Sequence, residues 1–396
     1  MMKGDNLYYE VPVAPKIVGG EGCFEAMGEE LRAIGAVSAI LLCDEAAEKA
    51  LTAEKVRIAL TAAGVRTGAN YMVADGNAAF SSVYELRDIY RINNCDSIVA
   101  CGGEDTVNTA KALRMLLSSQ AVTLDEIAGV DVAKSKVTVP FAVIPAGVDT
   151  SSSVTRSAFL KKEDGEGREF RSSLGKADVC VVDAGTDLGA SFRSIAVGAV
   201  EVLAGSIESF VSLNAGKLTK CMDLFAMRAI RDSLDKALED PGDATAMWQL
   251  RQAGLLSGLA YDTAGAGLVR AMTNALTVVC GGRREEYSGI VLPEVLRFNL
   301  ESRKDDYAEA LYYVVGDDRF ASTAADMRAE TFVSTVSDLT ARLYKEAGVA
   351  RTLGERGLKE EDVSSVAASA AGDYSLMTNP VRATAEDIAE ILRRLL

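Results

Sequence analysis

Two consecutive glycines, Gly102 and Gly103, lie between an apolar run at residues 98–100 and a helical pattern that extends to Met115. A strand, a glycine turn and a helix N-terminus together present backbone N–H groups that can bind phosphate. Glycine also lets a ligand approach the backbone closely, because it has no side chain. The same arrangement is typical of an ordinary turn, so these residues leave a phosphate-binding turn and a plain turn as alternatives.

A second polar stretch, residues 145–155 (PAGVDTSSSVT), follows an apolar run at 137–144 that we predict to be a buried strand. Its hydroxyl groups could donate hydrogen bonds to a nicotinamide, ribose or phosphate group. The residues concerned are Thr150 and the three serines Ser151, Ser152 and Ser153. As an isolated string the stretch would fit a polar loop equally well.

Asp44 closes an almost continuous apolar run at residues 37–43, which has the pattern of a buried parallel strand. An acidic residue after the second strand of such a unit commonly hydrogen-bonds an adenosine ribose, and its charge repels a 2′-phosphate. This interpretation favours NAD(H) over NADP(H). An N-cap for a short helix at 45–51 is an equally good interpretation.

The elements that would position these residues alternate between strand and helix. The predicted strands are 8–13, 37–43, 70–73, 98–100, 137–144 and 179–183, and the predicted helices are 24–33, 45–51, 53–63 and 81–93. Such alternation predicts a doubly wound, mostly parallel sheet of the Rossmann-like kind. From Leu188 onward the pattern is helical and rich in Ala and Leu, ending in a helix at 385–396. We therefore predict an α/β domain at 1–186 and an all-helical domain at 187–396.

Composition excludes several classes of protein. The 396 residues are 48% hydrophobic and 25% charged, with a net charge of −15, which argues against nucleic-acid and anionic-membrane partners. We find no signal peptide and no apolar run near 18 residues, so a cytoplasmic protein is expected. The seven cysteines have no metal-binding spacing and are expected to be reduced core thiols. The chain contains no histidine, the commonest general acid or base.

Several motifs resemble those of one family over the whole chain. Residues 101–111 (CGGEDTVNTAK) are similar to A-G-G-G-S-x-x-D-T-A-K, with Cys101 at the first Ala, and residues 145–155 to P-T-T-A-G-T-G-S-E-V-T. Further similarities are LPEV at 292–295, FN at 298–299 and NPVR at 379–382. These motifs resemble the iron-containing (group III) alcohol dehydrogenases, which share their fold with dehydroquinate synthase. The resemblance implies that fold, with an active cleft between the two domains, and we also expect a homodimer.

The resemblance also assigns cofactor-binding positions. In the glycine turn they are Gly102, Gly103, Asp105, Asn108 and Lys111, and in the polar stretch they are Thr150, Ser151, Ser152 and Thr155. Two departures from the family pattern are acidic, because Glu104 replaces a Gly and Asp105 a Ser. Two carboxylates beside a pyrophosphate would repel it.

In metal-using members of the family, one Asp and three His of the helical domain hold a divalent ion that polarises the substrate oxygen. The corresponding positions here are Glu201, Gly205, Arg270 and Arg284, with Arg283 as the alternate for the last. Glycine has no side-chain ligand and arginine does not deprotonate, so this set predicts no catalytic metal. Either Glu201 forms a structural salt bridge with Arg270 or Arg284, or the guanidinium groups bind a substrate anion.

Three functions remain from this reasoning. The first is a metal-independent, NAD(H)-linked oxidoreductase acting on a small, anionic alcohol or carbonyl compound, with Arg270, Arg284, Glu201 and Tyr287 as candidate catalytic residues. Its proton donor would be Tyr261, Tyr287, a lysine or water. The second is a pseudoenzyme that persists as a binding or assembly subunit. A lyase similar to dehydroquinate synthase is the weakest of the three, because it too needs a metal.

Overall fold

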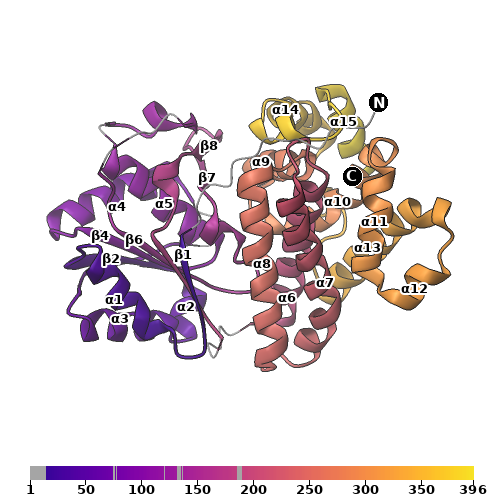
Figure 1. The fold of residues 1–396 in the computed structure, drawn as a ribbon. Coiled ribbons are helices and arrows are strands. Elements are labelled where there is room, and N and C mark those ends of the chain that lie inside the picture. Colours follow the sequence, from indigo (N-terminus) through magenta and orange to yellow (C-terminus); the bar gives the residue numbers. More distant parts are fainter. Residues whose placement is uncertain are drawn as a thin grey trace. The chain divides into compact units, whose positions relative to one another are not determined.

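The computed structural model describes residues 15–74, 76, 78–119, 121–131, 135, 137–184 and 190–396. The chain divides into two compact units, Val13–Ala190 and Ser191–Leu396 (Figure 1). The strand predicted at 8–13 and the domain boundary predicted at 186/187 both lie outside the described residues.

The first unit is built on a six-stranded sheet in which every pair of neighbouring strands is parallel, in the order β1-β9-β6-β4-β2-β3. The strands are β1 (Lys16–Gly20), β2 (Ser38–Cys43), β3 (Arg66–Met72), β4 (Ser97–Gly102), β6 (Phe141–Pro145) and β9 (Val179–Asp183). After β2 the chain continues to β3 on one side, and after β4 it continues to β6 on the other. The strand order therefore reverses between β2 and β4, where open α/β sheets commonly bind ligands.

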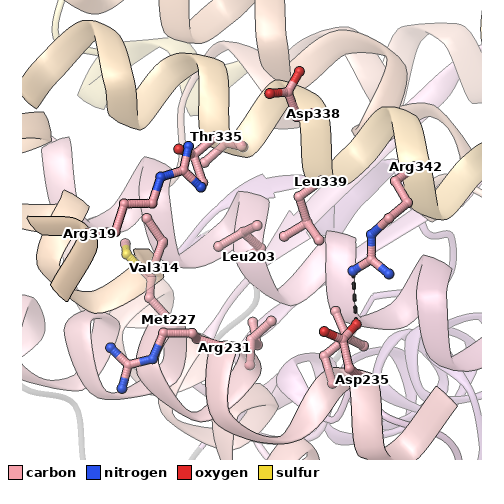
Figure 2. Close-up of a pocket in the computed structure, with 13 residues that line it drawn as sticks. Leu203, Met227, Arg231, Asp235, Val314, Arg319, Thr335, Asp338, Leu339 and Arg342 are labelled. Atoms are coloured by element: carbon pink, nitrogen blue, oxygen red, sulfur yellow. Dashed lines mark hydrogen bonds and ion pairs between the residues drawn. The ribbon is translucent and has the colours of Figure 1, made fainter. Parts of the chain in front are cut away.

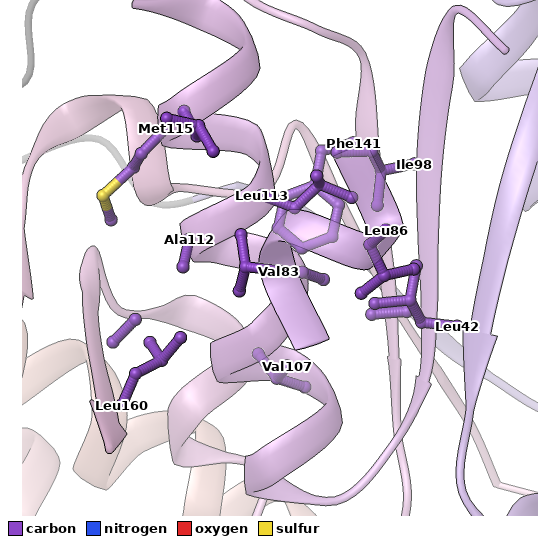
Figure 3. Close-up of a cluster of buried hydrophobic side chains, with 14 of the residues drawn as sticks. Leu42, Val83, Leu86, Ile98, Val107, Ala112, Leu113, Met115, Phe141 and Leu160 are labelled. Atoms are coloured by element: carbon purple, nitrogen blue, oxygen red, sulfur yellow. The ribbon is translucent and has the colours of Figure 1, made fainter. Parts of the chain in front are cut away.

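Helices cover both faces of this sheet: α1 (Phe24–Ala33), α2 (Glu45–Lys49), α3 (Thr52–Ala62), α4 (Phe80–Ile92) and α5 (Glu104–Ser118). Because successive strand residues point to opposite faces, Ile40 and Leu42 pack with α4 and α5, whereas Ala39 and Leu41 pack with α1 and α3. Figure 3 shows the first of these two cores. The predicted doubly wound α/β unit is confirmed.

The region between β4 and β9 differs from the prediction. A second sheet with strand order β5-β8-β7 consists of β5 (Gly129–Val130), β7 (Ser157–Lys161) and β8 (Gly167–Arg171), and the sequence interpretation missed it. The strand predicted at 137–144 begins only at Phe141, because Val137 is exposed and Pro140 precedes the pairing with β4. The strand predicted at 70–73 begins earlier, at Arg66, since β3 is a half-exposed edge strand without an apolar pattern.

The second unit is helical throughout, with no strand between residues 190 and 396, all of which are described. This confirms the predicted helical region. Its helices are α6 (Phe192–Val211), α7 (Lys217–Glu239), α8 (Ala244–Ala264), α9 (Leu268–Cys280), α10 (Glu285–Asn299), α11 (Lys304–Val315), α12 (Asp317–Ser322), α13 (Arg328–Glu346), α14 (Glu360–Ala371) and α15 (Ala385–Arg394).

Helix α6 is long and apolar enough to cross a membrane by length and composition, so the expectation of no such apolar run is wrong. In the structure, 89% of its apolar window is buried. Helices α7, α8 and α10 pack against it. Its apolar composition therefore matches its position as the core helix of this unit.

The seven cysteines are all free. Four of them are buried, as expected, but Cys221 is exposed on α7 and Cys23 and Cys280 are half-buried. The prediction of uniformly core thiols is therefore wrong for three of the seven.

Candidate functional site

The glycine turn lies at the point where the strand order reverses. Gly102 ends β4, and Gly103 is the N-cap of α5. A Cβ atom at Gly102 would lie 2.5 Å from Asp44 Oδ2 and 2.7 Å from Thr106 Oγ1, so packing alone requires glycine there. A Cβ atom at Gly103 would meet only Asp44 Oδ2, at 3.7 Å, and its φ of −77° suits any residue. Internal packing therefore does not explain why residue 103 is a glycine, whereas the close approach of a ligand to the backbone would explain it.

Asp44 joins the ends of β2 and β4. Its Oδ1 accepts a hydrogen bond from the Ala47 N–H at 2.8 Å, which makes it the N-cap of α2. Its Oδ2 accepts from the Gly103 N–H at 2.7 Å. The N-cap interpretation is confirmed, and the second oxygen adds a contact with the glycine turn itself. The side chain is only 7% exposed.

The other acidic residue of the turn also has a protein partner. Asp105 Oδ2 accepts from the Gly76 N–H at 2.6 Å. Lys161 lies close enough to interact with this carboxylate, and burial lowers the pKa of that lysine. Asn108 follows on α5, where it is buried.

Lys111 connects α5 to the polar stretch. Its ammonium group is fully buried and donates to the carbonyl oxygen of Ser152, to Thr155 Oγ1 at 2.9 Å and to the carbonyl oxygen of Ser157 at 2.9 Å. An ammonium group has three N–H donors, so these bonds use all of them. Lys111 therefore holds the polar stretch in place.

The hydroxyl-bearing residues of that stretch differ in exposure. Thr150 precedes a 3₁₀ turn, Ser151–Val154, and is fully buried. Ser152 and Thr155 are buried as well, and the Thr155 hydroxyl donates to the Ser152 carbonyl at 3.2 Å. Ser151 is half-buried, and its N–H donates to Asp149. Of the predicted cofactor-binding hydroxyls, Ser151 is thus the most exposed.

A buried ion pair joins two of the positions that the sequence analysis predicted to replace metal ligands. Glu201 on α6 accepts from Arg284 Nη1 at 2.5 Å through Oε1 and from Ser288 Oγ at 2.5 Å through Oε2. The Glu201 and Arg284 side chains are each only 7% exposed. The salt-bridge interpretation of Glu201 is confirmed with Arg284, one of the two predicted partners. Arg283, the alternate for the Arg284 position, pairs with Glu285. Sequence reasoning missed Ser288, although it follows Arg284 by one helical turn.

Arg270 lies on α9 in the same unit. Its guanidinium carbon is 5.0 Å from the centroid of the Tyr261 ring, in a cation–π geometry, and its side chain is half-buried. Glu208 accepts from the backbone N–H groups of Val269 and Arg270, at 2.6 and 3.2 Å, and so caps α9. The positive charge of Arg270 lowers the pKa of the Glu208 carboxyl, and the negative charge of Glu201 raises it. Arg270 and Glu201 are thus both close enough to Glu208 for their charges to affect it.

Tyr287, the fourth candidate, has different partners. Its fully buried hydroxyl donates to the Gly281 carbonyl at 2.7 Å, and the Arg356 guanidinium lies 4.8 Å from its ring centroid. Burial raises the pKa of this phenol. These contacts give Tyr287 a structural role, and they do not connect it with Glu201.

Glu208 makes stability depend on pH. Burial raises its pKa from an ordinary value of 4.5 to about 7. Between these values the folded state holds a proton that the unfolded chain has released, so this group's contribution to stability falls as pH rises from about 4.5 to 7. We expect Glu208→Gln to reduce the loss of stability between pH 5 and pH 8 by about 2.5 kcal/mol, as measured by chemical unfolding. Glu45→Gln, on the surface, is the control, and equal pH dependence in all three proteins would contradict the expectation.

Comparison with known proteins identifies the class. Residues 14–184 match the family model described as iron-containing alcohol dehydrogenase, and residues 195–396 match the C-terminal model of the same family. The chain therefore belongs to the iron-containing alcohol dehydrogenase family, whose relatives are oxidoreductases.

Individual relatives agree with this assignment. The NAD-dependent methanol dehydrogenase of Bacillus methanolicus is 26% identical over 97% of this chain and 99% of its own length. The sulfoacetaldehyde reductase of Bilophila wadsworthia is 25% identical over 94% and 95%. An alcohol dehydrogenase structure from Oenococcus oeni, 21% identical, superposes with a TM-score of 0.89 over 98% of this chain and 100% of the other, which confirms the fold.

Proposed function

We propose that this protein is an NAD(H)-linked oxidoreductase that acts without a catalytic metal on a small, anionic carbonyl or alcohol compound. In the reducing direction, a hydride would pass from NADH to the carbonyl carbon and a proton to the oxygen, leaving NAD+ and an alcohol. The observation that carries the proposal is the buried Glu201–Arg284 ion pair, at two of the positions that the family resemblance assigns to metal ligands.

The chemistry of these residues does not fit a divalent ion. Both Glu201 oxygens already accept hydrogen bonds, from Arg284 and Ser288, and a guanidinium group has no lone pair for a metal. Gly205 has no side-chain donor. Within the described ranges, no three His, Cys, Asp or Glu side chains form a group that could hold a metal. A single carboxylate does not make an iron or zinc site.

An anionic substrate is supported by the guanidinium group of Arg270, which is half-buried. This group can stabilise negative charge on a substrate oxygen. Arg284 is buried and already paired with Glu201, so it does not supply a charge for the substrate. A relative named for an anionic aldehyde, the sulfoacetaldehyde reductase, also supports this class of substrate.

NAD(H) is supported by the reversal point of the sheet. Gly103 leaves room for a phosphate, and the Asp44 carboxylate would repel the 2′-phosphate of NADP(H). Ser151 supplies a half-exposed hydroxyl in the polar stretch. The NAD-dependent methanol dehydrogenase provides a precedent among relatives.

The test combines binding, metal content and activity. We expect isothermal titration to give tighter binding of NADH than of NADPH, and elemental analysis to give far less than one iron, zinc or manganese per chain. A chelator should leave the melting temperature unchanged. If the protein did bind an ion that was present at a hundredfold excess over its Kd, removing that ion would lower the free energy of unfolding by about 3 kcal/mol. About one ion per chain, lost together with activity, would refute metal independence.

Substrate class is tested with two aldehydes, sulfoacetaldehyde and uncharged propanal. Arg270→Gln is expected to lower kcat/KM for sulfoacetaldehyde by at least about a hundredfold while changing that for propanal much less. Arg297→Gln, an exposed arginine on α10, serves as the control. Equal losses for both aldehydes would refute anion recognition by Arg270.

A specific observation also favours the second candidate, a pseudoenzyme. The Gly103 N–H, which would face a phosphate, already donates to Asp44, and Glu104 and Asp105 place two carboxylates in the first turn of α5. A protein that binds neither NADH nor NADPH and reduces neither aldehyde would establish this alternative.

A further inference from the structure

A cavity of about 360 Å³ lies within the helical unit, among α6, α7, α11, α12 and α13. Its floor is apolar and includes Leu203, Met227, Val314 and Leu339 (Figure 2). The volume falls within the roughly 300–1,000 Å³ of small-molecule sites. Glu201, Arg270 and Arg284 do not line it, so it is separate from the cluster described above.

One end of this cavity carries hydrogen-bond donors without protein partners. Arg319 forms no ion pair or side-chain hydrogen bond with any residue in the described part of the chain. Thr335 Oγ1 is shielded from solvent and also has no hydrogen-bond partner there. Figure 2 shows the Arg319 guanidinium at the same end of the cavity as Thr335. The Thr335 hydroxyl has no surface that a ligand atom could contact, whereas Arg319 is exposed. The unpaired guanidinium of Arg319 is therefore the donor that favours an oxygen acceptor with negative charge.

The other charged groups of the wall are already paired or directed elsewhere. Arg342 Nη2 donates to Asp235 at 2.9 Å, and Arg231 donates to Asp232 and to the Tyr312 carbonyl. In Figure 2 the Asp338 carboxylate points away from the apolar floor. The positive charge available to a ligand is therefore concentrated at Arg319.

We propose that this cavity binds a small carboxylate with an apolar tail, of the medium-chain fatty acid class. Its carboxylate would accept hydrogen bonds from Arg319, and its tail would cover Leu203, Met227 and Leu339. Leu203 follows Glu201 by two residues on α6, which places their side chains about 200° apart around the helix. The ligand would thus lie on the opposite side of α6 from the Glu201–Arg284 pair, and the proposal is independent of the redox function.

The experiment is isothermal titration of the full chain with octanoate, octanol and octylamine. We expect octanoate to bind with one site per chain, and the neutral and cationic analogues to bind at least about tenfold more weakly. Arg319→Gln should weaken octanoate binding about tenfold, and Leu339→Phe, which fills the floor, should abolish it. Arg393→Gln, an exposed arginine on α15, is the matched control and should bind octanoate as the unmodified protein does.

Three outcomes would overturn the proposal. They are no octanoate binding by the unmodified protein, equal binding of octanoate and octylamine, and unchanged octanoate binding in both Arg319→Gln and Leu339→Phe. Circular dichroism and the melting temperature verify that each variant is folded. A failure here leaves the redox proposal intact, because that proposal is tested with NADH and aldehydes.

Discussion

Replacing Arg284 by methionine is expected to lower the free energy of unfolding by about 3–5 kcal/mol. The substitution keeps the bulk of the side chain but leaves the Glu201 carboxylate buried opposite an apolar group. Ser288 still donates to Glu201, so only the charge partner is lost. Urea unfolding, analysed with a common m-value, gives the difference directly.

The double variant Glu201→Gln with Arg284→Met separates the charge from the packing. Removing both charges eliminates the uncompensated carboxylate, so most of the lost stability should return. Arg297→Met, at an exposed ion pair on α10, is the control and should change stability by less than about 1 kcal/mol. A loss below about 1 kcal/mol for Arg284→Met alone would show that the pair is not buried as the structure describes.

Lys111→Met is expected to destabilise the α/β unit by about 3 kcal/mol or more. The buried ammonium group is the donor for three oxygens, those of Ser152, Thr155 and Ser157, and each unsatisfied buried group costs about 1–3 kcal/mol. NADH binding should weaken by at least about tenfold, because the polar stretch loses its anchor. Lys49→Met, an exposed lysine on α2, is the control.

The two effects of Lys111→Met distinguish a positioning role from direct contact with the cofactor. A lysine that only bound a phosphate would lose NADH affinity without a large loss of stability, since binding alone would be affected. Normal thermal stability combined with lost NADH binding would therefore contradict the positioning role. Parallel loss of both would support it.

Local patterns predicted much of the fold. The helix at 24–33 and the strand at 179–183 have the predicted bounds, because apolar spacing and end signals lie within the segments themselves. The β7–β8 hairpin was missed, although β7 alternates between half-buried and buried residues over its five positions. Such a short strand becomes distinct only when its partner is known.

In the candidate site, too, local features could be predicted, whereas contacts between distant residues could not. The N-cap role of Asp44 depends on neighbouring residues and could be predicted, but its bond to Gly103 requires β2 and β4 to be adjacent. Glu201 and Arg284 are 83 residues apart, and no local signal selects Arg284 over Arg283. Partner choice across such distances depends on how helices pack, which a single sequence does not specify.

The apolar character of α6 has a consequence for synthesis in the cell. The helix ends at Val211, whereas α10, the last of its three main packing partners, ends only at Asn299. At translation rates of about 5–20 residues per second, its apolar surface stays uncovered for several seconds on each ribosome. During that interval a nascent chain presents the kind of segment that chaperones and membrane-insertion machinery recognise. The yield of folded protein should therefore depend on how quickly α7, α8 and α10 are synthesised and cover it.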